Sequence, residues 1–327
     1  MPPASHPPVP RRGLPRAGGE VREPGHLGGS AAGEELRLQW WVTGLGAAMV
    51  LLILRDVFHT LWHPTAHGGL SRLVMTAIWR LSSALGPRWG LPGLAGPLAL
   101  VSVVALWVLT VVAGWALIYW PHMPEGFGYA AGLRPADHGG LPDAVYVSLV
   151  TLSTLGLGDI APTEGWLRVV APLEGLVGFA LLTATVSWIL GIYPALARRR
   201  ALALRLSQLS RTHPAAEQLD SPAGAALLLD LAAGLAVLAV DFLQYAESYY
   251  FHDGDDRTSL ARHIGYAVGA ADRAAGARHP DVRAAGAVLR TALEDLAEVV
   301  DRRFLHTHGP TRQVLEAFAD DHGRRGS

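Results

Sequence analysis

The sequence predicts an all-α membrane protein, and two features of its hydropathy indicate this class. First, three apolar segments are long enough to cross a bilayer, which takes about 20 residues of helix. Tryptophan or tyrosine stands at the ends of these segments, as expected for side chains at a membrane interface. Second, proline and glycine divide the carboxy-terminal part into stretches with helical periodicity. The apolar segments are Gln39 to Trp62, Leu94 to Trp120 and Trp166 to Tyr193.

The composition narrows the classes of protein to which the chain can belong. Its 327 residues include 27 basic and 28 acidic side chains, and every one of these basic residues is arginine. A nearly neutral total argues against bulk binding of nucleic acid. The absence of cysteine excludes disulfides and thiolate metal sites.

The amino-terminal region is expected to hold a tail, a spanning helix and a helix on the membrane surface. Residues 1–38 are rich in proline and glycine, which predicts a disordered tail. Residues 39–93 then contain the first apolar segment and a shorter amphipathic stretch, Leu70 to Leu85. Arg72 and Arg80 fall inside that stretch, so it predicts a helix on the inner membrane surface rather than a further span.

The most informative motif lies between the second and third apolar segments and runs Thr151-Leu-Ser-Thr-Leu-Gly-Leu-Gly-Asp159. Glycine at alternate positions, Gly156 and Gly158, allows positive φ angles that other residues resist, so successive carbonyls can point toward one axis. Several such loops around one axis would form cages of oxygen atoms for a cation. Taken alone the motif could be a glycine-rich turn, but the flanking spans favour a pore.

The segment from Asp143 to about Ile192 resembles the pore module of prokaryotic potassium channels, the two-helix ion channel family. A short pore-helix candidate ending at Thr151 precedes TLGLGD, and Pro162 and Arg168 fall where that family places them. The resemblance implies a pore module of outer helix, pore helix, filter and inner helix over residues 94–196. It also implies a homotetramer, since one filter loop per chain makes one quarter of a ring.

The same resemblance assigns roles to individual residues. Backbone carbonyls of the filter, together with the Thr154 hydroxyl, would bind potassium ions. Gly178 would be the gating hinge of the inner helix, and Asp159 and Arg168 would support the filter. The residues expected in the filter are Thr154, Leu155, Gly156, Leu157 and Gly158.

The motif departs from the family pattern at two filter positions and two supporting ones. Leu155 and Leu157 replace valine and tyrosine, and Val147 stands where the pore helix would supply the tyrosine's aromatic partner. Because both ends of that hydrogen bond are apolar here, its loss can be nearly neutral. Val150 takes the place of a pore-helix glutamate, and Glu174 in the third apolar segment is the expected substitute, bracing the filter's outer end.

Residues 197–327 are expected to form a cytosolic helical domain. The stretch 223–243 is apolar enough for a fourth span, but Asp230 and Asp241 within it fit the polar edge of a soluble helix better. No sequence pattern reveals what the domain senses or binds. The expected helices are 197–211, 222–249, 258–275, 280–306 and 310–321.

The distribution of arginine predicts the orientation of the chain in the cell membrane. Arg72, Arg80 and Arg88 lie in one loop without acidic residues, and several arginines follow the third span from Arg198 onward. Both regions are expected on the cytoplasmic side. Residues 121–142 and the amino terminus would then be outside, and the carboxy terminus cytoplasmic.

The function predicted from these features is passive, potassium-selective conduction through a tetrameric filter in the lipid bilayer. One alternative is a weakly selective cation channel, because the two leucines could leave the filter deformable. Another is a non-conducting membrane adaptor or sensor that uses the pore scaffold. No nucleophile, metal cage or phosphate loop points to an enzyme, and no cofactor is expected besides the permeant potassium ions.

Overall fold

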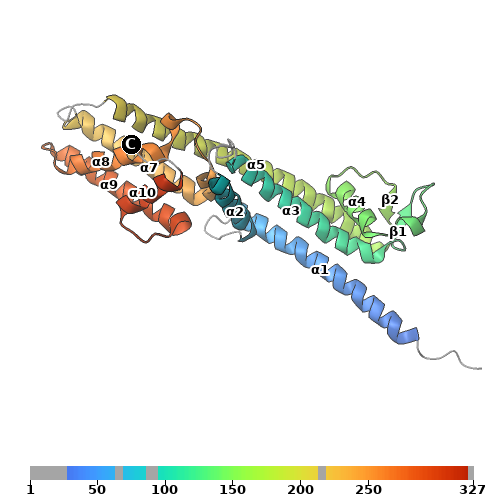
Figure 1. Ribbon diagram of the computed structural model, residues 1–327. Helices are drawn as coiled ribbons and strands as arrows, with labels where there is room; N and C mark the ends of the chain where they lie inside the picture. The colour runs from blue at the N-terminus through green and yellow to red at the C-terminus, as the bar shows by residue number, and fades with distance from the viewer. Residues whose placement is uncertain (1–27, 63–68, 86–94, 213–218, 323–327) are drawn as a thin grey trace, which may run out of the picture.

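The computed structural model describes residues 28–62, 69–85, 95–212 and 219–322. They form an elongated helical molecule with two parts (Figure 1). One part holds long apolar helices with a short hairpin and a short helix, and the other is a bundle of shorter helices. A single helix, α5, runs through both parts, so continuous backbone joins them.

Two long apolar helices, α1 (Gly28–Trp62) and α3 (Ala95–Tyr119), pack against each other. They approach closely where glycines face one another: a Cβ added to Gly46 would lie 2.4 Å from the carbonyl oxygen of Gly114. Small residues at a helix crossing are typical of packing within membranes. The small size of these two glycines therefore lets α1 lie directly against α3.

The start of α1 corrects one expectation. Residues 28–38 were expected in the disordered tail, but the helix already begins at Gly28. Alanine, glutamate, leucine and arginine make up most of this stretch, and their high helix propensity extends the apolar helix toward the amino end. The rest of the predicted tail, residues 1–27, lies outside the described residues.

The amphipathic stretch forms α2 (Gly69–Leu85), as predicted. A buried carboxylate joins it to the two long helices: Asp56 Oδ2 accepts hydrogen bonds from Ser71 Oγ at 2.6 Å and from Trp107 Nε1 at 3.0 Å. The three residues come from α1, α2 and α3. Polar bonds of this kind are a means of fixing helices in an apolar environment.

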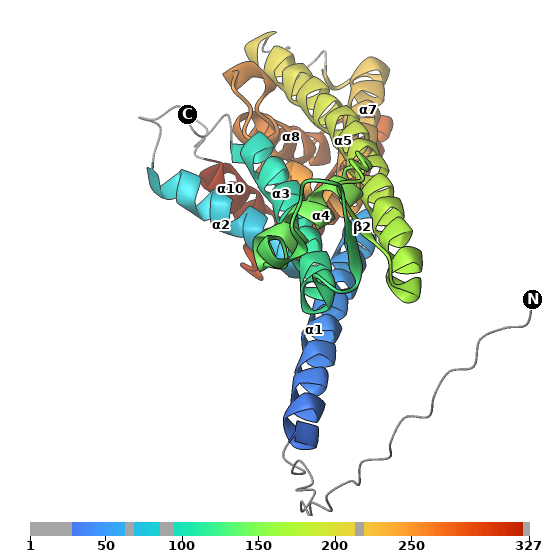
Figure 2. The ribbon, with the colours of Figure 1, turned by 90° about the vertical axis from the view of Figure 1, so that its right-hand side faces the viewer.

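Between α3 and α5 the chain forms a compact excursion of short elements. Two strands pair in antiparallel fashion, with Gly128 opposite Ala161. The sequence predicted a purely helical chain. Strands this short have no periodicity from which they could be predicted. Figure 2 looks along the molecule and shows α4 beside α3 and α5, which it contacts. The elements are η3 (Trp120–His122), β1 (Phe127–Tyr129), η4 (Pro135–Asp137), α4 (Leu141–Leu152) and β2 (Ile160–Pro162).

Helix α5 (Gly165–Thr212) is 48 residues long and continuous. The sequence predicted separate helices ending at Tyr193 and starting at residue 197, and this break is wrong because Pro194 lies inside the helix. Proline removes one backbone donor, but strong helix formers follow it, and Leu202 and Leu206 are buried in the bundle. Tertiary packing therefore carries the helix past the proline.

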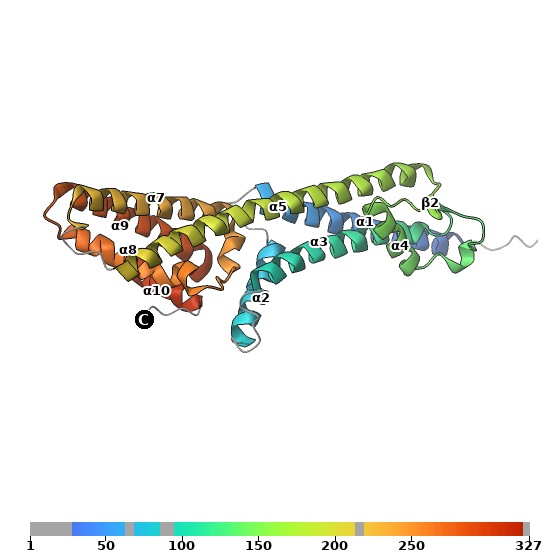
Figure 3. The same ribbon diagram turned by 90° about the horizontal axis from the view of Figure 1, so that it is seen from above.

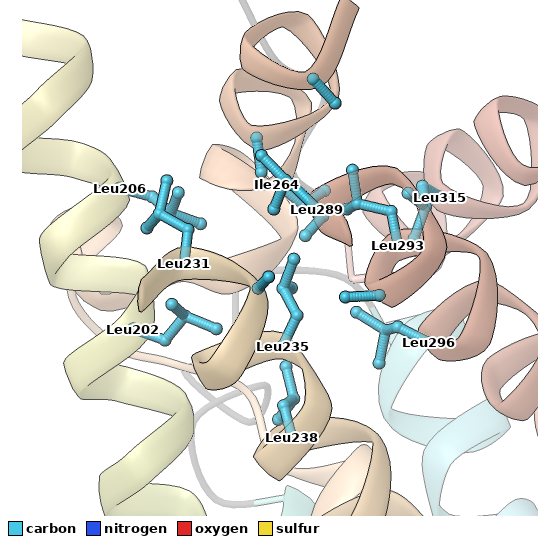
Figure 4. Packing of buried hydrophobic residues seen from close by; sticks show 14 of the residues in the cluster. Leu202, Leu206, Leu231, Leu235, Leu238, Ile264, Leu289, Leu293, Leu296 and Leu315 are labelled. Atoms are coloured by element: carbon cyan, nitrogen blue, oxygen red, sulfur yellow. The ribbon is translucent and has the colours of Figure 1, made fainter. Parts of the chain in front are cut away.

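The bundle packs α7 and α8 against the end of α5, α9 packs on both of these helices, and α10 packs on α8 and α9 (Figure 3). Leucines from α5, α7 and α9 form its centre, with residues of α8 and α10 around them (Figure 4). The helices predicted over 222–249 and 280–306 are shorter than expected because single turns follow them. The elements are α7 (Pro222–Gln244), η5 (Ala246–Tyr250), η6 (Asp256–Thr258), α8 (Leu260–Ala275), α9 (Pro280–Val300), the π turn η7 (Asp301–Leu305) and α10 (Thr311–Asp321).

In the part of the chain that the structure describes, four helices, α1, α3, α5 and α7, are long and apolar enough to cross a membrane by length and composition. Helix α7 differs from the other three in its surroundings. Its leucines are buried among the bundle helices, and Asp230 and Asp241 form ion pairs with Arg205 and Arg198 of α5. This arrangement suits a helix of the bundle, with its two aspartates at the polar edge.

Candidate functional site

Helix α4 is the short helix predicted before the glycine motif. At 12 residues it is too short to cross a bilayer. Asp143 starts it, because Oδ2 accepts the backbone N–H of Gly140 at 3.1 Å while Oδ1 lies 3.1 Å from His138 Nδ1. The helix contacts α5, and it ends at Leu152, where the glycine motif continues the chain.

The backbone of the motif has positive φ at every second residue: 58° at Thr154, 55° at Gly156 and 76° at Gly158. Alternation between left-handed and ordinary conformations turns successive peptide planes so that their carbonyls can face one side. The glycines adopt the conformation that the sequence predicted. Thr154 was not expected to do so, because a Cβ makes left-handed backbone cost about 1–2 kcal/mol.

The amides that begin this loop are bonded to the carbonyl end of α4. Thr154 N–H donates to Thr151 O at 2.9 Å, and Leu155 N–H donates to Val150 O at 3.0 Å. These bonds satisfy helix carbonyls that otherwise lack partners. Within the described residues, by contrast, no N–H or O–H donates to the carbonyl oxygens of residues 154–158. The loop is thus held by its amides, and its carbonyls are left for another partner.

Asp159 closes the motif and is held by a residue that sequence reasoning missed. Its Oδ2 accepts a hydrogen bond from Tyr146 Oη at 2.6 Å, and its Oδ1 accepts from the N–H of Ile160 at 3.0 Å. The bond from Tyr146 is the main cause that holds the pKa of Asp159 below its usual value. The sequence predicted Glu174 as the support for this aspartate, because Val150 replaces the pore-helix glutamate, and the tyrosine on the same short helix was the signal that went unused.

Glu174 is fully buried at the contact of three helices. Its Oε1 accepts from Ser148 Oγ of α4 at 2.5 Å, and its Oε2 accepts from Tyr119 Oη of α3 at 2.6 Å. The carboxylate was expected to brace the region of Asp159 or Arg168. Its contacts are instead to the middle of α4, so it holds the short helix behind the motif rather than the motif's outer end.

Gly178 lies where α5 passes the end of α4. A Cβ added there would lie 2.1 Å from the carbonyl oxygen of Leu152, closer than any side chain can come. The glycine predicted as a hinge therefore has a packing reason of its own: it lets α4 end against α5. Whether the helix also bends at Gly178 stays a prediction.

The remaining predicted residues are divided between buried and exposed positions. Val147 is 3% exposed and lies in the apolar cluster shared by α3, α4 and α5. Leu155 and Leu157 are 68% and 62% exposed and lie outside that cluster. Arg168 is exposed near the start of α5. The pairing of Val147 with Leu157, and the filter-supporting roles of Val147 and Arg168, stay predictions.

One face of α5 carries an exposed apolar stripe along the segment predicted to span the membrane. Its residues recur every three or four positions, so they share one side of the helix. This side is not covered by α1, α3 or α4, and it continues past the motif. The stripe consists of Val169, Leu173, Leu176, Phe179, Leu182, Val186, Leu190 and Tyr193.

Comparison with known proteins finds a family that is similar to one segment of the chain. Residues 105–192 match the family model described as "Ion channel", and this segment contains α4, the glycine motif and Gly178. This segment of the chain is therefore similar to the ion channel family. The match thus covers the pore segment and leaves the bundle outside it.

Two relatives of the chain are proteins of bacteria. The chain is 28% identical over 145 residues, 44% of its length, to the "Uncharacterized membrane protein YdjJ" of Bacillus subtilis. It is 29% identical over 109 residues, 33% of its length, to the "Putative potassium channel protein RPA4233" of Rhodopseudomonas palustris. The matched parts span only 41% and 24% of these relatives' own lengths. No solved structure matches the chain.

Beyond the channel segment, α5 enters the bundle through three consecutive arginines. Arg199 is 2% exposed, and it donates to Ser248 O at 2.6 Å, to Phe251 O at 2.8 Å and to Asp253 at 3.1 Å. Arg200 Nε also donates to Asp253 Oδ1 at 3.0 Å. The arginines that predicted the cytoplasmic side thus also attach α5 to the bundle.

Removing the shared acid should loosen that attachment. Asp253→Ala leaves the buried Arg199 without its counter-charge, and breaking a buried ion pair costs about 3–5 kcal/mol. Asp230→Ala is the matched control, since its pair with Arg205 is about half exposed on both sides and surface pairs contribute about 0–1 kcal/mol. Thermal unfolding of the purified protein should show a clear fall only for Asp253→Ala. Equal shifts for the two variants would contradict this account of the junction.

Proposed function

We propose that this chain is a homotetrameric, potassium-selective channel whose filter is the loop from Thr154 to Gly158. One observation carries the proposal: φ is positive at alternate residues of this loop, and its carbonyl oxygens accept no hydrogen bond from the described residues. Carbonyls in that state can replace the hydration shell of a cation. The relative named as a potassium channel supports potassium as the ion.

The surfaces of the single chain support the tetramer. The loop residues are exposed, and the apolar stripe on α5 is left uncovered by the residues that the structure describes. Four copies around one axis would bring four loops together and bury apolar surface, which contributes about 25 cal/mol per Å² removed from water. In lipid the same contact would depend on close packing.

Conduction would be passive. Ions would lose water at the mouth and occupy successive sites formed by the carbonyls of Thr154, Leu155, Gly156 and Leu157, with the Thr154 hydroxyl at the inner end. Mutual repulsion between neighbouring ions would keep them moving. We further propose the cell membrane as the location, with the carboxy-terminal bundle cytoplasmic and the amino terminus outside, as the arginine distribution predicts.

A second candidate is a cation channel with weak preference for potassium. The observation that favours it is the high exposure of Leu155 and Leu157, whose side chains have no hydrogen-bonding group to fix the filter wall. Flux measured in liposomes under opposed potassium and sodium gradients separates the two candidates, because the reversal potential gives the permeability ratio directly.

Replacing Gly156 with alanine tests the filter. A Cβ there meets no described atom of the same chain within 4 Å, so within the chain the penalty is the positive φ of 55° that alanine resists. We expect potassium flux from purified protein in liposomes to fall to near background while membrane insertion is unchanged. Gly165→Ala is the control, since its Cβ is equally free and no positive φ is required. Flux like that of the wild-type protein from Gly156→Ala would overturn the filter assignment.

A further inference from the structure

A cavity of about 280 Å³ lies in the bundle, far along the chain from the filter. It is lined by residues of α7, α8 and the start of α9, and by the chain segments that precede α7 and join α8 to α9. Helix α9 packs closely on both α7 and α8, whereas α7 and α8 touch each other little. Space therefore remains between them, with a volume near the lower end of ligand pockets, about 300–1,000 Å³.

The floor of the cavity is apolar and shielded from water. Leu231 is 1% exposed, Leu228 is 5%, and Val282 is 2%. Ala270 and Ala274 form the wall on α8, and their small side chains leave the space unfilled. Such a lining favours an apolar guest, because hydrophobic burial is non-directional and scales with area.

The rim carries one positive group available to a guest. The guanidinium of Arg273 lies 5.5 Å from the centre of the Tyr266 ring. Among the described residues no carboxylate forms an ion pair with it. Guanidinium groups bind carboxylates through two parallel hydrogen bonds.

The acid at the rim, Asp220, is already engaged. Its two oxygens accept the backbone N–H groups of Arg278 at 2.9 Å and His279 at 2.8 Å. These bonds hold the pKa of Asp220 below its usual value. The carboxylate therefore stays ionised and bonded to these two backbone amides. A cationic guest would have to compete with both backbone donors, whereas an anionic guest has Arg273.

From this combination we propose that the bundle cavity is a binding site for a small amphipathic carboxylate. The apolar chain would lie on Leu228 and Leu231, and the carboxylate would bind Arg273 above Tyr266. A neutral apolar molecule would leave the guanidinium unused and should bind less well. The site is independent of the proposed conduction through the filter.

The position of the site gives binding a route to the channel helix. Leu231 belongs to the same packed cluster as Leu202 and Leu206 of α5, as Figure 4 shows. A guest in contact with Leu231 would therefore add packing contacts to α7, the helix that packs against α5. Because a ligand that binds only the folded state raises its stability, the melting temperature should rise with ligand concentration.

Octanoate is the probe, titrated calorimetrically into the full-length protein in lipid nanodiscs, with empty nanodiscs subtracted. We expect saturable binding and a rise in melting temperature. Arg273→Gln should weaken the affinity at least about tenfold, because a hydrogen bond between charged groups is lost. Arg290→Gln is the control, an exposed arginine of α9 outside the cavity lining, and should change the affinity less than about twofold.

Two further measurements locate the guest and its head group. Ala270→Phe fills the wall and should abolish saturable binding, provided that the variant melts cooperatively; if it does not, Ala274→Val takes its place. 1-Octanol, with the same chain and no charge, should bind at least about tenfold more weakly than octanoate. No saturable heat with octanoate would overturn the site. Equal affinity for octanol, or equal loss in the two arginine variants, would overturn the role of Arg273.

Discussion

Gly178→Ala should disrupt the packing of α4 against α5 and abolish ion flux. The added Cβ would lie 2.1 Å from Leu152 O and 3.0 Å from the same residue's carbonyl carbon, both backbone atoms that cannot rotate away. Relief requires α4 to move, and forced overpacking costs about 1–3 kcal/mol or more. Because the N–H of Leu155 donates to the carbonyl oxygen of Val150 near the end of α4, this movement would also displace the proposed filter loop. Unfolding in detergent and flux in liposomes measure the two effects.

The sign of the stability change separates a packing role from a hinge role. If Gly178 served only as a hinge, alanine would stiffen the helix and stabilise it by up to about 1 kcal/mol. Gly175→Ala is the control one turn earlier, since its Cβ would lie an ordinary 3.7 Å from Thr151 O. That variant should be as stable as the wild-type protein or slightly more so. A Gly178→Ala protein that is equally stable and conducts would contradict the packing account.

The parts of this fold that sequence could predict are those set by local chemistry. The apolar segments became α1, α3 and the first half of α5, and the stretch with two arginines became α2. Gly156 and Gly158 predicted positive φ angles at their positions, because no other residue adopts positive φ as readily. Hydropathy and backbone freedom are properties of single residues and their near neighbours, so they can be read without a partner.

The parts that could not be predicted depend on contacts between distant segments. The continuity of α5 through Pro194 depends on the bundle that buries Leu206. The positive φ of Thr154 follows from the bonds that attach the loop to α4, since threonine alone would avoid it. Tyr146 bonds to Asp159 because the end of the loop returns to lie beside α4. A sequence shows that each of these residues is present, but it does not show which distant residue each one contacts.

Glu174 illustrates the same limit, and its variants should have the second largest effect. The carboxylate was predicted to be functional because a charge within a spanning helix is expensive. In the structure it is the shared acceptor of Ser148 Oγ and Tyr119 Oη, and it joins α3, α4 and α5. Both hydroxyls depend on this one acceptor. The stability of the pore segment should therefore respond to the whole set of three groups rather than to the charge alone.

Glu174→Leu should strongly destabilise the protein, because two buried hydroxyls lose their acceptor at about 1–3 kcal/mol each. Glu174→Gln keeps one acceptor oxygen and should fall between this variant and the wild-type protein. The triple variant Tyr119→Phe, Ser148→Ala and Glu174→Leu removes every polar group at once, and replacing a buried polar set by apolar groups is often nearly neutral. It should regain much of the lost stability, with a coupling visible in the mutant cycle. Unfolding in detergent measures this. A triple variant no more stable than Glu174→Leu would mean that the carboxylate acts through contacts other than these two hydroxyls.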